Sequence, residues 1–80
     1  MISREEAMKK VNEEIDYYLT NFEAGYRAHN DYLTSQSEAV LSAIPQVLYC
    51  AGFLTNVEKA DMVGKIIEKK GKIRRRIVYG

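Results

Sequence analysis

The sequence is poor in residues that cross-link a chain or coordinate a metal. It holds one cysteine, Cys50, and one histidine, His29. A disulfide within the chain is therefore excluded, and a zinc site, which usually takes four ligands, is not expected. A chain of 80 residues builds only a thin core, so regular helix packing or self-association has to supply the stability.

Long apolar runs are also missing. The most apolar stretch, residues 39–54, is interrupted by Ser42, Pro45 and Gly52, so no membrane-spanning segment is expected. The N-terminus lacks the apolar core of a signal peptide. Because a lone thiol is typical of reducing compartments, we expect a soluble, cytoplasmic protein.

Few residues are suited to catalysis. His29 stands next to Asn30 and Asp31 without an evident partner, and Cys50 lies in an apolar segment where a buried thiol would be inert. The carboxylates of residues 13–16 are expected to be exposed, and no glycine loop for phosphate is present. We therefore expect no enzyme activity, no metal, no cofactor and no small-molecule substrate.

Charge, by contrast, is abundant and unevenly distributed. Residues 1–58 carry four basic and nine acidic side chains, whereas residues 59–80 carry eight basic and two acidic ones. The net charges are −5 and +6, although the whole chain has a net charge of only +1. Such asymmetry is typical of a surface for an anionic partner, or of a solvated tail.

The first predicted helix begins after Ser3 and runs to about Ala28. Ser3 and Glu6 have the spacing of a capping box. Apolar residues then recur every three or four positions, which predicts one buried stripe with Leu19 beside it. The stripe consists of Met8, Val11, Ile15, Tyr18, Phe22 and Tyr26.

The second predicted helix follows a break at residues 29–31. Ser35 and Glu38 repeat the capping-box spacing, and Gly52 is placed to end the helix. Its apolar residues cover most of its circumference, so we expect it to be the central helix. Pro45 predicts either one kinked helix or two short ones, and we favour the kinked one. The main stripe is Val40, Ile44, Val47, Leu48 and Ala51.

The third predicted helix follows a capping box of Thr55 and Glu58 and ends at Lys70, before Gly71. Its expected core face is Ala60, Val63, Ile66 and Ile67. The connection from the second helix is as short as in a helix-turn-helix. However, the positions four before and six after Gly52 hold Leu48 and Glu58, where that motif has a small and a hydrophobic residue. A winged variant that uses the basic end stays open.

The last residues allow two interpretations. Residues 73–79 are rich in β-branched side chains and follow a glycine, which favours a strand or an extended tail. The alternative is a helix that continues through Gly71, because Val63, Ile66, Lys70, Ile73 and Ile77 keep the three and four spacing. We favour the extended tail.

The sequence thus predicts an all-α protein: a small three-helix bundle over residues 1–71, with its second helix central and kinked at Pro45, and a basic extended or short β C-terminal tail over residues 72–80. Arginine suits bidentate contact with phosphate or carboxylate, and exposed tyrosine is common at protein interfaces. The candidate partner-binding residues are Lys72, Arg74, Arg75, Arg76, Tyr79, Tyr17 and Tyr32.

These residues predict a small binding module that acts on a protein partner or on a second copy of itself. An accessory or inhibitor protein, such as those encoded by phages and mobile elements, would have these properties. The alternative is a nucleic-acid-binding protein that uses the same basic C-terminal segment.

Overall fold

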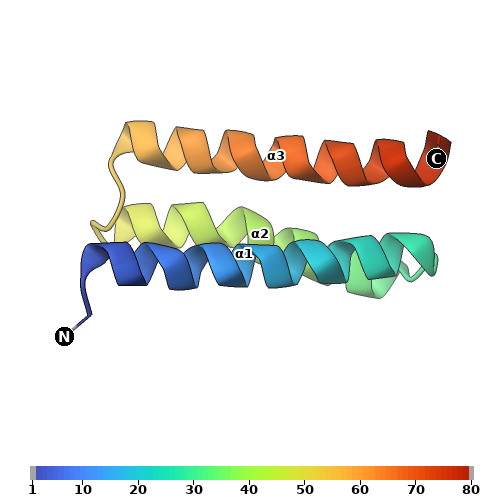
Figure 1. Cartoon of the computed structure of the whole chain (residues 1–80), viewed down its shortest axis with the longest axis horizontal. Helices are drawn as coiled ribbons and strands as arrows, with labels where there is room; N and C mark the ends of the chain where they lie inside the picture. Colours follow the sequence, from blue (N-terminus) through green and yellow to red (C-terminus); the bar gives the residue numbers. More distant parts are fainter. Residues whose placement is uncertain (1, 80) are drawn as a thin grey trace.

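The computed structural model describes residues 2–79 of the chain, and the side chains of residues 2–78. It contains three helices, α1 (Arg4–Arg27), α2 (Asp31–Cys50) and α3 (Asn56–Tyr79), and no strand within the described residues. Figure 1 shows α1 and α3 running in one direction and α2 in the other. The predicted all-helical, three-helix fold is confirmed.

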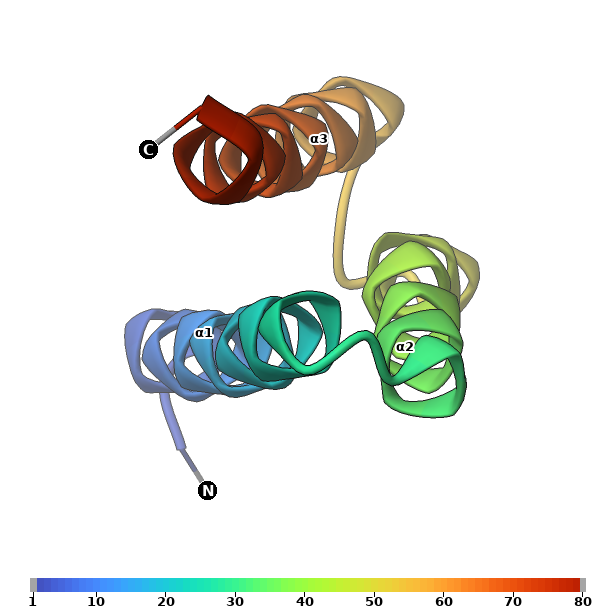
Figure 2. The ribbon, with the colours of Figure 1, turned by 90° about the vertical axis from the view of Figure 1, so that its right-hand side faces the viewer.

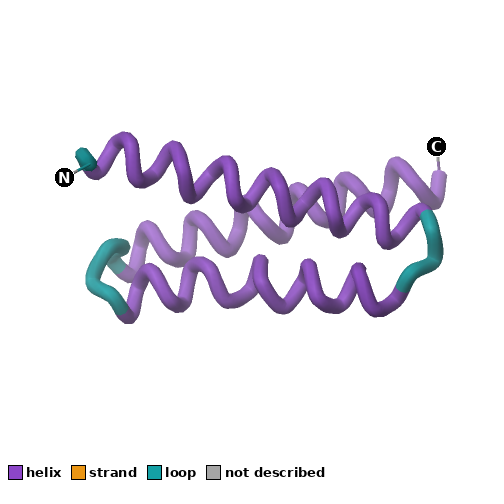
Figure 3. Tube along the Cα trace, turned by 90° about the horizontal axis from the view of Figure 1, so that it is seen from below, coloured by secondary structure: helices purple, strands orange, loops and turns teal. Residues whose placement is uncertain are grey.

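The three helices lie at the corners of a triangle when the bundle is viewed along its axis (Figure 2). The two connections lie at opposite ends of the molecule (Figure 3), which measures 41 × 22 × 18 Å. α2 is therefore not a central helix, as its apolar circumference had suggested. Val47, on its predicted stripe, is 62% exposed.

α1 begins and ends as its local sequence dictates. The Ser3 Oγ accepts a hydrogen bond from the amide of Glu6 (3.1 Å), as predicted. At the other end the amide of Asn30 donates to the carbonyl of Gly25 (2.8 Å), which closes a Schellman turn. His29 occupies the left-handed position of that turn, with φ of 54°.

α2 begins earlier than predicted. Its N-cap is Asn30, whose side chain accepts from the amide of Leu33 (3.0 Å). The predicted capping box of Ser35 and Glu38 therefore falls inside the helix and is wrong. Ser37 is buried there, and its hydroxyl donates to the carbonyl of Leu33 (2.8 Å), so that this buried hydroxyl has a partner.

Pro45 lies inside α2, which is a single helix, as favoured over two short ones. Its ring is fully buried in the bundle. This burial offsets part of the cost of the hydrogen bond that proline cannot donate. The kink at Pro45 stays a prediction. Gly52, with φ of 79°, ends the helix in a second Schellman turn, in which the amide of Phe53 donates to the carbonyl of Leu48 (2.9 Å).

Both hydrogen bonds of the predicted capping box are present at the start of α3. The amide of Thr55 donates to Glu58 Oε1 (2.9 Å), and the amide of Glu58 donates to Thr55 Oγ1 (3.2 Å). The helix does not end before Gly71, however, but continues to Tyr79. The extended tail that we favoured is therefore replaced by the helical alternative. Gly80 lies outside the described residues.

The core explains why α3 continues. Ile73 is buried (7% exposed) and Ile77 packs against the core. An interior glycine costs about 1 kcal/mol in a helix, whereas burying one isoleucine side chain contributes about 1.5–3 kcal/mol. The core is formed by the side chains of Ile15, Leu19, Phe22, Leu41, Leu54, Met62, Ile66 and Ile73.

Candidate functional surfaces

Two of the candidate arginines form ion pairs with the other two helices. Arg74 pairs with Glu38 of α2 (2.7 Å), and its guanidinium lies 5.3 Å from the centre of the Phe22 ring. Arg76 pairs with Glu23 of α1 (2.8 Å). These contacts join the last turns of α3 to both other helices. The two guanidinium groups are therefore partly neutralised before any partner arrives.

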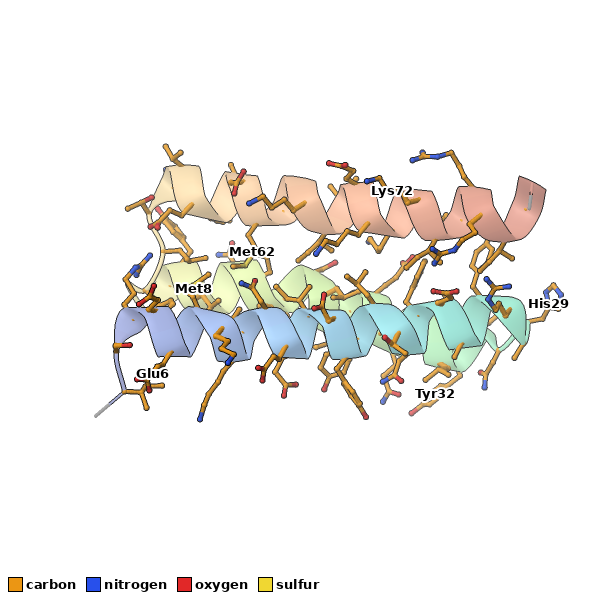
Figure 4. The ribbon with its side chains drawn as sticks, viewed as in Figure 1. Glu6, Met8, His29, Tyr32, Met62 and Lys72 are labelled. Carbon is orange, nitrogen blue, oxygen red and sulfur yellow. The ribbon has the colours of Figure 1, made fainter. Side chains whose placement is uncertain are left out.

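The other cationic candidates lie on the outer side of α3. Lys72, labelled in Figure 4, pairs with Glu68 one turn earlier (3.2 Å). Arg75 is exposed and forms no ion pair with any described residue. The side chain of Tyr79 lies outside the described ones. The structure therefore divides the predicted basic cluster between different sides of α3.

The two candidate tyrosines lie on different helices. Tyr17 is 59% exposed on α1, where its ring contacts Tyr18 edge to face at 5.1 Å between centroids. Tyr32 is 75% exposed at the start of α2, near the turn that carries His29 (Figure 4). The candidate residues with described side chains therefore come from the middle of α1, the start of α2 and different sides of α3.

A different surface emerges between α1 and α2. It is an apolar groove of about 350 Å³ with Lys10 and Glu14 at its edge. The remainder of its lining consists of Val11, Ala43, Ile44, Val47 and Leu48. Sequence analysis assigned Val11, Ile44, Val47 and Leu48 to the core. Val11, Ile44 and Leu48 are half-buried and do pack against it, whereas Val47 is exposed. The signal that pointed to this surface was the apolar circumference of the second helix, which is wider than one core face needs.

A smaller hollow of about 190 Å³ lies between α1 and α3, where Met8 and Met62 lie on its walls (Figure 4). Its rim is charged, and Lys69 of α3 approaches Asp16 of α1 across it (3.8 Å). Exposed ion pairs of this kind contribute little to stability. The hollow therefore combines apolar walls, formed by Met8, Ile15 and Met62 among others, with a charged rim.

The pKa of Glu58, at the start of α3, is lowered from its ordinary value. The amide of Thr55 donates a hydrogen bond to the Glu58 carboxylate, and this lowers the pKa of Glu58; the Arg4 guanidinium, 2.6 Å away, lowers this pKa further. Arg4 also donates to the carbonyl of Phe53 (2.6 Å) and lies 4.9 Å from the centre of the Phe53 ring. The arrangement ties the N-terminus of α1 to the α2–α3 connection, which is a structural role.

Side chains that could bind a metal ion are scattered over residues 2–79. No three His, Cys, Asp or Glu side chains gather there as a metal ion would require. Cys50 is exposed at the end of α2, and not buried as expected. None of the three helices has the combination of length and apolar character that crossing a membrane needs.

The chain matches no protein-family model, no curated protein and no solved structure. Its function therefore has to be inferred from its own surfaces.

Proposed function

We propose that this chain is a small, non-enzymatic binding module that holds a helical segment of a partner protein in the groove between α1 and α2. The observation that supports this proposal is the apolar lining of the groove, above all Val47, which is 62% exposed. An apolar side chain in water gains free energy when a partner covers it, at about 25 cal/mol per Å² of apolar surface.

The shape of the bundle favours a helix as the occupant. Two packed helices leave a valley on each side of their line of contact, and α3 occupies one of the two valleys of the α1–α2 pair (Figure 2). The groove lies between the same two helices and is lined by neither α3 nor the connections. A partner helix would complete a four-helix arrangement, which is a common mode of recognition by helical proteins.

The edge of the groove indicates which side chains the partner helix should carry. Lys10 and Glu14 lie one turn apart on α1, and neither belongs to an ion pair within the described residues. Tyr17 follows three residues after Glu14, so it lies on the same side of α1. The preferred segment is therefore an amphipathic helix with an apolar stripe and flanking charges of both signs.

Nucleic-acid binding, the alternative, receives less support. Cationic side chains of α3 are interleaved with carboxylates, as in the Lys65–Asp61 pair (3.0 Å) and the Lys72–Glu68 pair (3.2 Å). A phosphate backbone would have to displace these pairs and those of Arg74 and Arg76. Strong binding to DNA or RNA that weakens steeply with salt would favour the alternative over a protein partner.

A photo-cross-linking experiment tests the proposal. A benzophenone amino acid replaces Ala43 in the groove, and in the control it replaces Ser42, which lies about 100° around the same helix. Both chains are exposed to nuclease-treated extract of the native host and irradiated. We expect the Ala43 probe, and not the Ser42 probe, to form an adduct with an amphipathic helical segment of one protein.

A second pair of variants tests the same surface by substitution. Val47→Glu introduces a charge into the groove, and Val57→Glu introduces the same charge on α3, where the valine is 79% exposed. We expect only Val47→Glu to abolish the adduct. Equal adducts from both probes, or an adduct that survives Val47→Glu, would refute binding in the groove.

A further inference from the structure

The outer face of α3 carries a second stripe, separate from the core and from the groove. Its members are spaced alternately by three and four residues from Val57 to Gly71, and Val78 follows seven residues later. A seven-residue repeat of this kind is the pattern by which two helices pack along their length. The stripe consists of Val57, Ala60, Gly64, Ile67, Gly71 and Val78. Val78, at its end, also lines a hollow of about 510 Å³ that α3 shares with the α1–α2 turn.

The apolar members of this stripe are in contact with water. Val57 is 79% exposed, and Ile67 and Val78 are each 59% exposed. Their β-branched side chains are poor helix formers, so helix propensity does not favour them at these positions. Apolar side chains at these positions are expected where another molecule covers the outer face of α3.

Gly64 is an independent indication that a second helix approaches this face of α3. A glycine inside a helix reduces its stability relative to alanine. At Gly25 the bundle requires glycine, because an added Cβ would lie 2.7 Å from the Thr34 Oγ1. At Gly64 an added Cβ would meet no atom within 4 Å. The packing of this chain therefore does not need a glycine there, whereas close approach by a second helix would.

We propose that two copies of the chain associate through this face, with their α3 helices antiparallel and related by a two-fold axis. In that arrangement the two α3 helices run in opposite directions, so that a residue before the axis in one copy faces a residue after the axis in the other. Ile67 of each copy then lies opposite Gly71 of the other when the axis passes near Lys69. The Arg75 guanidinium of the same chain lies over Gly71, 3.3 Å from the position that a Cβ would take there. In the dimer it has to turn away from Gly71, and a large side chain over the glycine then lets the two helices approach closely.

Charge favours this antiparallel arrangement over a parallel one. Residues 68–79 hold six basic side chains and one acidic side chain, whereas residues 56–67 are balanced. A parallel pair would place the two basic halves together. The antiparallel register that pairs Ile67 with Gly71 also brings Asp61 near Arg75 of the second copy. Arg75 is the arginine of the basic run that forms no ion pair among the described residues.

Sedimentation equilibrium from about 10 μM to about 1 mM tests the proposal. We expect the mass to rise from 9.2 kDa toward twice that value, and Ile67→Glu to weaken association at least tenfold. Gly64→Glu provides a second test at a site with open space. Val47→Glu, in the groove, is the matched control and should associate as the unsubstituted chain does. Helix content from circular dichroism shows that each variant is folded.

Charge exchange tests the orientation. Asp61→Arg and Arg75→Asp should each weaken association, and the double variant should restore it. A mass of 9.2 kDa at every concentration, association that Ile67→Glu leaves unchanged, or a double variant weaker than both single ones would overturn the proposal. Because the groove variant is the control here, this test can fail without affecting the proposed binding of a partner helix.

Discussion

Gly25 and Gly64 offer a sharp test of the packing, because one substitution should have opposite effects at the two sites. Both glycines lie inside helices, where alanine is favoured by about 1 kcal/mol. At Gly25, however, a Cβ would lie 2.7 Å from the Thr34 Oγ1 and 2.9 Å from its backbone nitrogen. The backbone of Thr34 is held in place, because its amide donates to the carbonyl of Asn30 (3.1 Å).

The magnitudes follow from these contacts. Forcing one extra carbon into a packed site costs about 1–3 kcal/mol. Because two contacts at Gly25 are shorter than 3.0 Å and one of them is to backbone, the cost should lie in the upper part of this range, about 2–3 kcal/mol. After the gain of about 1 kcal/mol in helix propensity, Gly25→Ala should lower the free energy of unfolding by about 1–2 kcal/mol. Gly64→Ala meets no neighbour and should raise it by about 0.5–1 kcal/mol. For a domain of this size 1 kcal/mol corresponds to a shift of about 4–8 °C in Tm.

The assay is urea unfolding followed by far-ultraviolet circular dichroism, at a concentration where sedimentation shows the monomer. The slopes of the transitions should be equal, so that the midpoints report stability alone. A Gly25→Ala variant as stable as the unsubstituted chain would refute the close approach of α1 to the start of α2. A Gly64→Ala variant that loses stability would refute the open space beside Gly64.

Three further predictions follow from single contacts. Phe22→Ala should lower the free energy of unfolding by about 3–5 kcal/mol, because the ring is fully buried; a loss below about 1 kcal/mol in urea unfolding would contradict that burial. Arg74→Ala should cost about 0.5–1 kcal/mol through its ion pair and its contact with Phe22, whereas Arg75→Ala should change the same quantity by less than about 0.5 kcal/mol; equal effects would contradict the different placement of the two arginines. Because the pKa of Glu58 is lowered in the folded chain, its carboxylate stabilises the fold above the ordinary pKa of glutamate, and this contribution is lost as the pH falls through the lowered value; Tm measured from about pH 7 to about pH 3 should therefore fall less for Glu58→Gln than for the unsubstituted chain.

The parts of the fold that could be predicted from sequence are those that depend on neighbours within one turn. The caps at Ser3 and Thr55 each join a side chain to an amide three residues away, so that their spacing is sufficient evidence. The end of α2 at Gly52 could likewise be predicted, because the left-handed backbone that closes the helix there is a local property that favours glycine. The start of α2 was missed because Asn30 and Ser35 are both suitable caps. The Schellman turn after Gly25 favours the earlier one.

The end of α3 could not be predicted in this way. Residues 73–79 have local preferences for a strand, and the contacts that keep them helical come from distant parts of the chain. Arg74 and Glu38 are 36 residues apart in sequence, and Arg76 and Glu23 are 53 apart. The apolar residues of α2 were similarly assigned to one core, because spacing alone does not separate a core face from an uncovered groove. The basic run was therefore expected to bind a partner, whereas two of its members stabilise the bundle.

The central claim is that residues 72–79 are the last turns of α3, because the ion pairs of Arg74 and Arg76 with the other two helices, and the place of Arg75 in the proposed dimer, depend on a continuous third helix. Residue-resolved amide hydrogen exchange tests this claim most directly. We predict that the amides of Ile73 to Ile77 exchange as slowly as those in the middle of α1, since Ile73 is buried and its neighbours are paired across the bundle. Exchange of these amides at the rate of an unfolded chain, with α1 still protected, would contradict the claim.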